Sequence, residues 1–463
     1  MALSKLLTTK IVLVLICALF LFTRLYKISE IPSSLYWDEA SIGYNAYSIS
    51  KDLKDEWGKF LPIHFRAFGE FKLPVYIYST VPFVKIFGLN ELSIRLPSVL
   101  FSLGVVCLIF FLARKLTGSE KIGLWSSFFM TISPWFFIFS RTGYEVTAGL
   151  MFYLLAILLF LQDKKGGRFI LYSIISFILS AYSYNSFRII SPLTILALIL
   201  FEGHIKLLRQ QKIYFLISFI LLILAVIPIY RLVVYDAGIS RLQAVGSSSQ
   251  LIILNYFSHF NPFFLSISGD TNLRHQQVGF GQLYFPELIL LVAGLVNFIS
   301  NKSKSGLLVV TLVLLGPIPA AITKESPHAL RSLSMVPFIH IISATGAVYL
   351  GQFLRRNSVN ITIAAVFLAF FIYYFINFLT IYPAESLGDW QYEYKKIFTD
   401  SLNKFEQNGR ILISDRGGQP YIFALFYLQY DPNKFRKEVV RNPIDKWGFS
   451  TVKSFGRFEF GSL

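Results

Sequence analysis

Long apolar stretches dominate this chain, and short polar connections separate them. A helix needs about 20 mainly apolar residues to cross a bilayer, and eleven stretches approach that length. They lie at residues 11–28, 94–113, 122–140, 143–162, 169–185, 188–201, 213–234, 284–300, 306–323, 330–352 and 359–382. The pattern predicts an all-α polytopic membrane protein with about eleven transmembrane helices. We expect the first stretch to be a membrane anchor, because no small-residue cleavage site follows it.

Basic residues occupy every second connection between the apolar stretches. These connections are RKLTGSEK (114–121), DKKGGR (163–168), HIKLLRQQK (204–212), NKSK (301–304) and RRN (355–357). Lys and Arg accumulate in the cytoplasmic loops of membrane proteins. We therefore predict an integral plasma (inner) membrane protein, with the N-terminus and the basic loops in the cytoplasm and the alternate connections outside.

One apolar segment does not fit this alternation. Residues 74–88 are short and are interrupted by Pro74 and Pro82. If they crossed the bilayer, every later basic loop would face outward, against the charge bias. We therefore expect an interfacial or re-entrant helix within a large first external loop, residues 29–93.

The polar pattern also divides the chain into two parts. Residues 1–382 form the predicted transmembrane domain, which carries a second long external loop at 235–283. Residues 383–463 are more polar and contain a helix-like stretch followed by a short β-like run before Gly-Gly. This region is predicted to be a small external α/β segment.

Composition agrees with a membrane protein and excludes several other classes. Hydrophobic residues make up 54% of the chain and charged residues only 15%, whereas a soluble domain has roughly 25% charged residues. The formal net charge is +17, from 43 Lys and Arg against 26 Asp and Glu. The positive-inside rule and anionic headgroups account for this excess, and no nucleic-acid-binding motif is present. A cytosolic enzyme, a disordered chain and a disulfide scaffold are excluded.

The most specific chemical feature is an adjacent carboxylate pair just after the first apolar stretch. Asp38 and Glu39 lie in YWDEASIGYNAY (36–47). A carboxylate at an external membrane boundary can act as the base for a hydroxyl acceptor, and a neighbouring charge tunes it. The alternative is that Asp38 caps a helix that runs through Ala40–Ser50. The residues alone leave both interpretations open.

Cations recur on the predicted outer face. Lys72 stands where the chain returns to the interface and could meet a phosphate at headgroup depth, or it could extend to lipid headgroups. The other outer loops supply Arg141, Arg188, Arg241, Arg274, His259, His275, His328 and Arg331. Outer cations oppose the usual bias, so a shared anionic ligand is one explanation. The alternative is solvated loop charge, or pairing with Glu145, Asp236 or Asp270.

Motifs for other chemistries are missing. The chain has no Walker A or GxGxxG loop, no HExxH and no GxSxG, which removes support for nucleotide-driven transport, dinucleotide redox chemistry and hydrolase triads. His64 and the three outer histidines named above could bind a metal with Glu70 or Asp270, but none has a tight ligand spacing. No cofactor is assigned, and a divalent metal ion is left open.

The order of several short motifs resembles a known family. The first-loop Asp-Glu, the K-x-P step at Lys72, RLPS (95–98), SPW…SR…E (133–145) and HALR (328–331) look like the GT-C glycosyltransferases that use polyprenyl-phosphate sugars. The similar groups are the dolichyl-phosphate-mannose–protein mannosyltransferase-like proteins and the lipid A aminoarabinose transferases. The resemblance covers most of the membrane region.

The resemblance implies a GT-C fold and assigns roles to the residues. Asp38 is expected to be the catalytic base with Glu39 beside it, and Lys72 is expected to contact the donor phosphate with Arg141, Arg188, His328 and Arg331. The same cavity is expected to contain Tyr44, Glu145, Tyr184, His259, Asp270 and Arg274. Phe71 stands where the aminoarabinose transferases can carry an acidic residue, so a metal site copied from them is doubtful.

The implied activity is an inverting transfer of mannose or a similar sugar from a polyprenyl-phosphate donor on the outer face of the membrane. The acceptor is a hydroxyl of a protein, lipid or glycan; the other expected partners are membrane lipids, and nucleic acid is not one. A transporter or flippase for a phosphate-bearing lipid would share the cations but should not need Asp38 as a base. A non-catalytic membrane scaffold is the third class.

Overall fold

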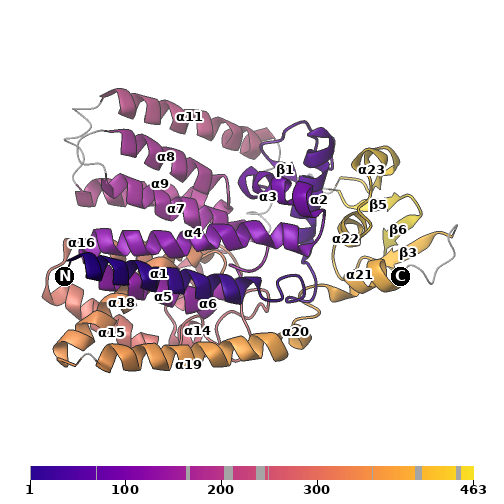
Figure 1. Cartoon of the computed structure of the whole chain (residues 1–463). Helices are drawn as coiled ribbons and strands as arrows, with labels where there is room; N and C mark the ends of the chain where they lie inside the picture. Colours follow the sequence, from indigo (N-terminus) through magenta and orange to yellow (C-terminus); the bar gives the residue numbers. More distant parts are fainter. Residues whose placement is uncertain are drawn as a thin grey trace.

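The computed structural model describes residues 2–68, 70–162, 167–202, 212–235, 246–248, 250–356, 358–401, 409–444 and 450–462. Each predicted apolar stretch corresponds to one helix of a bundle (Figure 1). These helices are α1 (Ala2–Leu25), α4 (Glu91–Thr117), α5 (Glu120–Ile132), α7 (Val146–Gln162), α8 (Arg168–Ala181), α9 (Asn185–Glu202), α11 (Lys212–Tyr235), α15 (Glu287–Ser300), α16 (Lys304–Leu315), α18 (Val336–Phe353) and α19 (Ser358–Thr380).

Within the part of the chain that the structure describes, six helical segments are long and apolar enough to cross a membrane, and four further apolar helices are shorter. The predicted integral membrane protein is thus confirmed. Proline limits two of the spans: α5 ends before α6 (Pro134–Phe137), and α16 ends before Pro317 and α17 (Ile318–Ala321). The residue before a proline is disfavoured in the helical conformation, and Ser133 before Pro134 is accordingly extended, with ψ 123°.

Close helix packing explains two glycines of the bundle. A Cβ atom on Gly346 of α18 would lie 1.9 Å from the carbonyl oxygen of Leu290, and one on Gly294 of α15 would lie 2.1 Å from that of Ile342. The backbones of α15 and α18 are therefore in direct contact, as small residues allow in membrane bundles.

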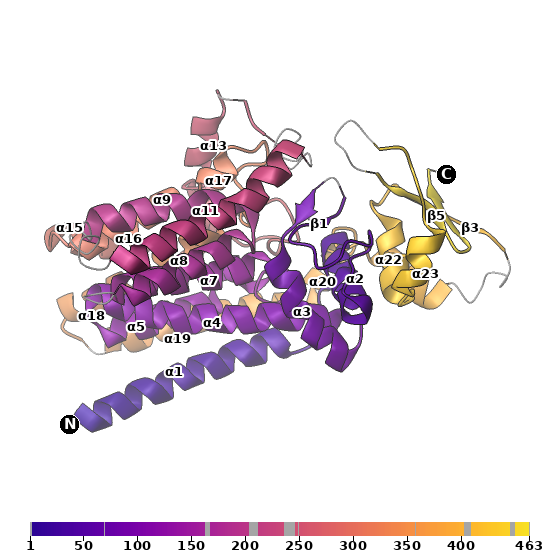
Figure 2. The same ribbon diagram turned by 90° about the horizontal axis from the view of Figure 1, so that it is seen from above.

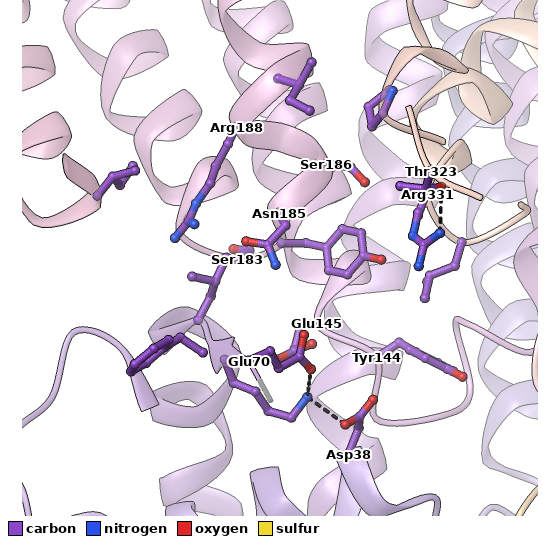
Figure 3. A pocket seen from close by; sticks show the side chains of 18 of the residues that line it. Asp38, Glu70, Tyr144, Glu145, Ser183, Asn185, Ser186, Arg188, Thr323 and Arg331 are labelled. Atoms are coloured by element: carbon purple, nitrogen blue, oxygen red, sulfur yellow. Dashed lines mark hydrogen bonds and ion pairs between the residues drawn. The ribbon is translucent and has the colours of Figure 1, made fainter. Parts of the chain in front are cut away.

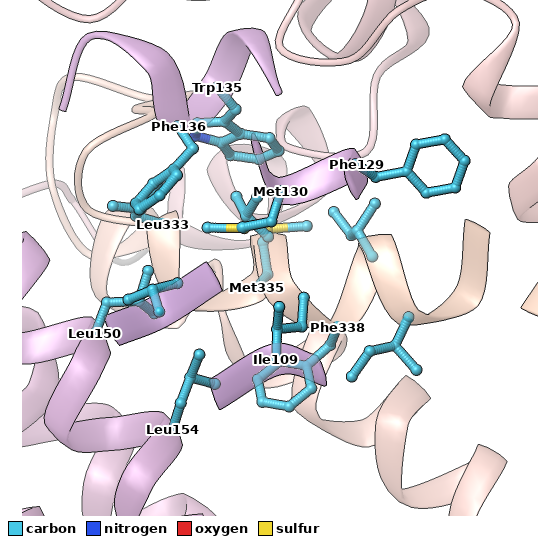
Figure 4. Close-up of a cluster of buried hydrophobic side chains, with 14 of the residues drawn as sticks. Ile109, Phe129, Met130, Trp135, Phe136, Leu150, Leu154, Leu333, Met335 and Phe338 are labelled. Atoms are coloured by element: carbon cyan, nitrogen blue, oxygen red, sulfur yellow. The ribbon is translucent and has the colours of Figure 1, made fainter. Parts of the chain in front are cut away.

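A cluster of buried apolar side chains surrounds the junction between α5 and α6. Figure 4 shows side chains from α4, α5, α6, α7 and α18 that meet the 3₁₀ turn η1 (Leu333–Met335). Trp135 is completely buried there and donates its indole N–H to the Ala329 carbonyl at 3.0 Å. The segment that precedes η1 is thereby held against the centre of the bundle.

The non-membrane elements gather at one end of the bundle (Figures 1 and 2). The first loop forms α2 (Trp37–Asp52), a hairpin of β1 (Phe65–Arg66) and β2 (Phe71–Lys72), and α3 (Pro74–Phe87). The helix expected at 74–88 is present as α3, and its 14 residues are too few to cross a bilayer. The N-terminus and the α4–α5, α15–α16 and α18–α19 connections lie at the opposite end (Figure 1).

The C-terminal region forms the predicted small α/β segment at the α2 end. It contains α20 (Tyr382–Glu385), α21 (Tyr392–Lys396), a π-helical turn (Ile397–Ser401), α22 (Pro420–Tyr427), α23 (Pro432–Glu438) and four strands. The sheet order is β3 (Ile411–Ser414), β6 (Phe458–Gly461), β5 (Val452–Phe455) and β4 (Val440–Arg441), with β3 parallel to β6 and the other pairs antiparallel. Two short helices, α13 (Ile252–Ser258) and α14 (Pro262–Ser266), precede α15.

The first loop and the C-terminal region share one apolar core that includes α2, α3 and α22. Tyr44 belongs to this junction, because its buried hydroxyl donates to the Tyr430 carbonyl at 3.1 Å. Glu56 is buried at the same junction and accepts a hydrogen bond from Tyr421 of α22 at 3.0 Å. Burial raises the pKa of Glu56 to about 7, although Arg441 opposes the shift.

We expect the junction to lose stability as pH rises. The folded pKa of Glu56 lies above its ordinary value of 4.5, so the folded protein retains a proton that the unfolded chain has lost between about pH 4.5 and 7. Stability should fall across that range and level off above it. Glu56→Gln should therefore raise the thermal unfolding midpoint at pH 8 and change it little at pH 5, as measured in detergent. The control is Glu459→Gln, which should show no such pH-dependent gain.

Candidate active site

A pocket of about 330 Å³ opens where the first loop meets the end of the helix bundle. Its walls come from the start of α2, from β2, from the 143–145 turn before α7, from the start of α9, from the end of α11, and from residues 319–331. Seven of the predicted site residues line it: Asp38, Glu39, Lys72, Glu145, Tyr184, Arg188 and Arg331. The pocket thus joins segments that lie up to about 290 residues apart in the chain.

The two adjacent carboxylates have different environments. Glu39 is 3% exposed; one oxygen accepts from Gly143 N at 2.7 Å and from Arg95 Nε at 3.2 Å, and the other accepts from Tyr36 N at 3.3 Å. Glu39, not Asp38, therefore satisfies the backbone at the start of α2. Asp38 keeps a side chain that is 26% exposed and faces the pocket (Figure 3).

Lys72 is buried between carboxylates. Its ammonium lies 2.9 Å from Asp38 and 3.1 Å from Glu70, and its side chain is only 3% exposed. Burial alone would lower the pKa of Lys72, but Asp38, Glu70 and Glu145 together raise it well above the ordinary value of 10.5. The β1–β2 hairpin, in which Phe65 pairs with Lys72, brings this ammonium to the pocket. Lys72 therefore does not extend to lipid headgroups.

Two arginines approach the pocket from the side opposite the carboxylates (Figure 3). Arg188 comes from the first turn of α9, and its guanidinium lies 3.2 Å from His64 Nε2. Burial, and then Arg188, lowers the pKa of His64 to about 4, so a neutral imidazole accepts this hydrogen bond. Arg331 donates to the Thr323 hydroxyl at 2.8 Å and lies 3.6 Å from the exposed Glu325.

The third side of the pocket is apolar. Ile189 of α9, together with Ile229 and Val233 of α11, faces Pro319, Ile322 and Leu330. Helix α11 lies at the edge of the bundle (Figure 1), and only 6% of its spanning window is buried. The pocket therefore runs from a charged interior to a helix that is open to lipid.

Six predicted site residues do not line this pocket. Arg141 is fully buried and donates to the carbonyls of Thr23, Arg24, Tyr26 and Ile31. Tyr44 lies in the junction with the C-terminal region, as described above. Arg274 stacks on Tyr36 with its guanidinium carbon 4.0 Å from the ring centre. The remaining three, His259, Asp270 and His328, belong to a separate cluster, and Arg241 lies outside the described residues.

Several pocket residues were not predicted as site residues. Tyr36, Tyr144 and Asn185 line the pocket beside predicted neighbours, and their types carry no signal of their own. Glu70 was considered only as a possible metal ligand, although its position two residues before Lys72 in an extended hairpin puts both side chains on one face. Arg95 was visible in RLPS but carried no expected role; it anchors Glu39.

The chain is similar to a known sequence family and to several solved structures. A sequence-family model described as dolichyl-phosphate-mannose-protein mannosyltransferase matches residues 72–230. No curated protein sequence matches the chain. ArnT from Cupriavidus metallidurans in the apo state has a similar structure, with a TM-score of 0.58 and 12% identity over 93% of this chain and 85% of that one. This chain has the GT-C fold. The predicted fold class and the resemblance are thus confirmed.

Two further GT-C structures were solved with lipid phosphates. ArnT from Cupriavidus metallidurans bound to undecaprenyl phosphate matches with a TM-score of 0.56 and 12% identity, over 93% of this chain and 85% of that one. AglB from Archaeoglobus fulgidus, in complex with an inhibitory peptide and a dolichol-phosphate, matches with a TM-score of 0.51 and 11% identity, over 91% of this chain and 64% of that one.

Removing the Arg95 guanidinium should destabilise the site. Arg95 is fully buried and donates to Glu39 and to the carbonyls of Ile28, Pro32 and Ser34. Removing one partner of a buried ion pair costs about 3–5 kcal/mol, so Arg95→Met should lower the unfolding midpoint strongly. Arg114→Met should change it little, because Arg114 is 49% exposed and its pair with Glu120 is worth about 1 kcal/mol or less. Equal midpoints in a detergent melting experiment would contradict the anchoring role of Arg95.

Proposed function

We propose that the chain is an inverting glycosyltransferase that moves a sugar from a polyprenyl-phosphate donor to a hydroxyl acceptor. One observation carries the proposal: the same pocket contains a partly exposed carboxylate, two arginines on the opposite side and an apolar wall that leads to α11. A lipid-linked sugar phosphate needs each of these surfaces. ArnT bound to undecaprenyl phosphate and AglB in complex with a dolichol-phosphate support this ligand class.

In the proposed reaction Asp38 is the general base. Its carboxylate accepts the proton of the acceptor hydroxyl while that oxygen forms a bond to the anomeric carbon of the sugar. The bond from the anomeric carbon to the phosphate oxygen breaks at the same time, and polyprenyl phosphate leaves with the electron pair. A single displacement inverts the anomeric configuration. The leaving phosphate is a stable anion, so no general acid is required.

The cations are proposed to act on the leaving phosphate. Arg188 and Arg331 lie on the wall nearest α9 and α11, where a phosphate attached to a prenyl chain would arrive. Preorganised cations stabilise the charge that develops as the bond to phosphate breaks. Lys72 is shared between Asp38 and Glu70, so a phosphate that approached it would compete with both carboxylates and would leave Asp38 freer to accept a proton.

The proposed active site faces the outside of a plasma (inner) membrane. The pocket lies at the α2 end of the bundle, and the N-terminus and the α4–α5, α15–α16 and α18–α19 connections lie at the other end (Figure 1). Lys and Arg lie in these connections or in the helix turns beside them, and such residues favour the cytoplasm. Mannose or a related sugar on a lipid carrier would supply the activated donor outside, where a nucleotide sugar is absent. The acceptor belongs to the hydroxyls of proteins, lipids or glycans.

Asp38→Asn should lower the transfer rate by about 10²–10⁴-fold, the usual contribution of a general base. The protein should still fold, because Asp38 is partly exposed and α2 is held by Glu39. The measurement is transfer of radiolabelled sugar from polyprenyl-phosphate donors by purified protein. Asp415→Asn, an exposed position in the C-terminal region, is the control and should retain activity. Near-normal transfer by Asp38→Asn would refute the base, whereas no transfer by the wild type would favour a transporter of phosphate-bearing lipids.

Arg188→Met and Arg331→Met should each weaken binding of undecaprenyl phosphate by about 10–100-fold, because a hydrogen bond to a charged group is worth roughly 1.5–3 kcal/mol. Binding can be followed by thermophoresis of the labelled protein in detergent. Asp38→Asn should bind the probe at least as well as the wild type, since it loses a negative charge. Arg114→Met, whose side chain pairs with Glu120 at the far end of α4, should bind normally. Unchanged affinity in both pocket variants would remove the arginines from the phosphate site.

A further inference from the structure

A second polar cluster lies beside the pocket described above and shares no lining residue with it. Asp270 and His275 come from the loop between α14 and α15, and His328 comes from the segment before η1. All three are buried, with 7%, 3% and 7% of their surfaces exposed. They line a cavity of about 510 Å³ together with Glu325, Asn272 and Ser258, among others.

The three side chains converge closely. One ligand atom from each residue lies within 4.8 Å of those of the other two, and the rings of His275 and His328 have centroids 4.8 Å apart. Ligand atoms on one tetrahedral ion with bonds of about 2.0–2.2 Å lie roughly 3.3 Å apart. The widest pair must therefore close by roughly 1.5 Å, which rotation of the side chains can supply.

Three donated hydrogen bonds fix the position of the Asp270 carboxylate. One oxygen of Asp270 accepts from the backbone N–H of Ala329 and from His275 Nδ1, each at 2.8 Å. The other accepts from Asn272 N at 3.0 Å. Because the carboxylate only accepts, Nδ1 of His275 carries the hydrogen and Nε2 keeps its lone pair. An ion in place of this hydrogen would bind Oδ2 of Asp270 and Nδ1 of His275 together, because these two atoms are only 2.8 Å apart.

His259, a neighbour of the cluster, holds the backbone at His328 in place. The Nδ1 atom of His259 lies 2.8 Å from the Asn255 carbonyl and donates to it, so Nε2 of His259 accepts the backbone N–H of His328 at 3.1 Å. A further possible ligand beside the cluster is Glu325, whose carboxylate is 3.8 Å from His328 Nε2 and is 73% exposed. It can rotate to provide a fourth ligand, or water in the cavity can take that position.

We propose that Asp270, His275 and His328 form a binding site for a divalent transition-metal ion of the zinc type. Two imidazoles and one carboxylate are a common zinc ligand set, with a fourth ligand from Glu325 or water. The ion would connect the loop after α14 to the segment before η1, because its ligands come from both.

The proposed metal ion would position Arg331 and would not contact the substrate. His328 and Arg331 are three residues apart, but His328 lines the second cavity and Arg331 lines the first. An ion on His328 would fix the segment from which Arg331 reaches the pocket. The metal site does not depend on the proposed glycosyl transfer, since its evidence is the convergence of its own ligands.

The test is the metal content of the full-length protein, purified in detergent without chelator and measured by inductively coupled plasma mass spectrometry. The wild type should carry about one ion per chain after incubation with Zn²⁺ and desalting, and Zn²⁺ should raise its unfolding midpoint. His275→Ala and His328→Ala should each lose most of the bound ion. His64→Ala, a histidine outside the cluster, should retain it.

A ligand replacement keeps the test decisive if the alanine variants fold poorly. His328→Cys should bind Co²⁺ and give a thiolate-to-cobalt charge-transfer band that wild-type protein lacks, because Cys is itself a good ligand for such ions. Wild-type protein that binds no Zn²⁺ would overturn the proposal. So would zinc content that is equal in the wild type and both alanine variants, which would mark an adventitious ion only.

Discussion

Two buried arginines fix the path of the chain between α1 and α2, beside the candidate active site, because they donate hydrogen bonds to its backbone carbonyls. After α1 ends, the chain runs through residues 26–36 without regular structure before α2 begins. Arg95 donates to three carbonyls of this connection, and Arg141 donates to four carbonyls at the end of α1 and in the connection. Buried carbonyls without partners would be costly near a bilayer. The two guanidinium groups remove that cost and so fix the start of α2.

This anchoring determines which carboxylate meets the pocket. Glu39 is drawn inward because Arg95 and the N–H of Gly143 both need an acceptor there. Successive residues of a helix point in directions about 100° apart, so Asp38 must then point elsewhere, and it points into the pocket. Its ion pair with Lys72 is a consequence of the same geometry. The chemistry proposed for Asp38 therefore rests on a structural role for its neighbour.

The sequence predicted the helices well and the site only in part, for a physical reason. In a bilayer, the backbone N–H and C=O groups of a single apolar span can all be hydrogen-bonded only within a helix, and each of the eleven stretches contains a helix. Asp38, Lys72 and Arg331 were found because charge near an outer membrane boundary is rare and needs a partner. Arg141 showed the same signal, but it donates to backbone carbonyls of the protein itself. No sequence pattern distinguishes a cation that binds a ligand from one that satisfies a distant carbonyl, since the carbonyl's need arises only from the fold.

Charged and titratable side chains line two adjacent cavities, and we propose a different role for each cavity. In the first cavity, an ammonium among carboxylates faces two arginines across a space that opens toward α11. In the second, a carboxylate and two imidazoles face each other within 4.8 Å. The short segment from Thr323 to Arg331 runs between them and contributes to both. Because Trp135 binds Ala329 and Asp270 binds the same residue's N–H, this segment is held at its centre, and the two cavities are coupled through backbone that has little freedom to move.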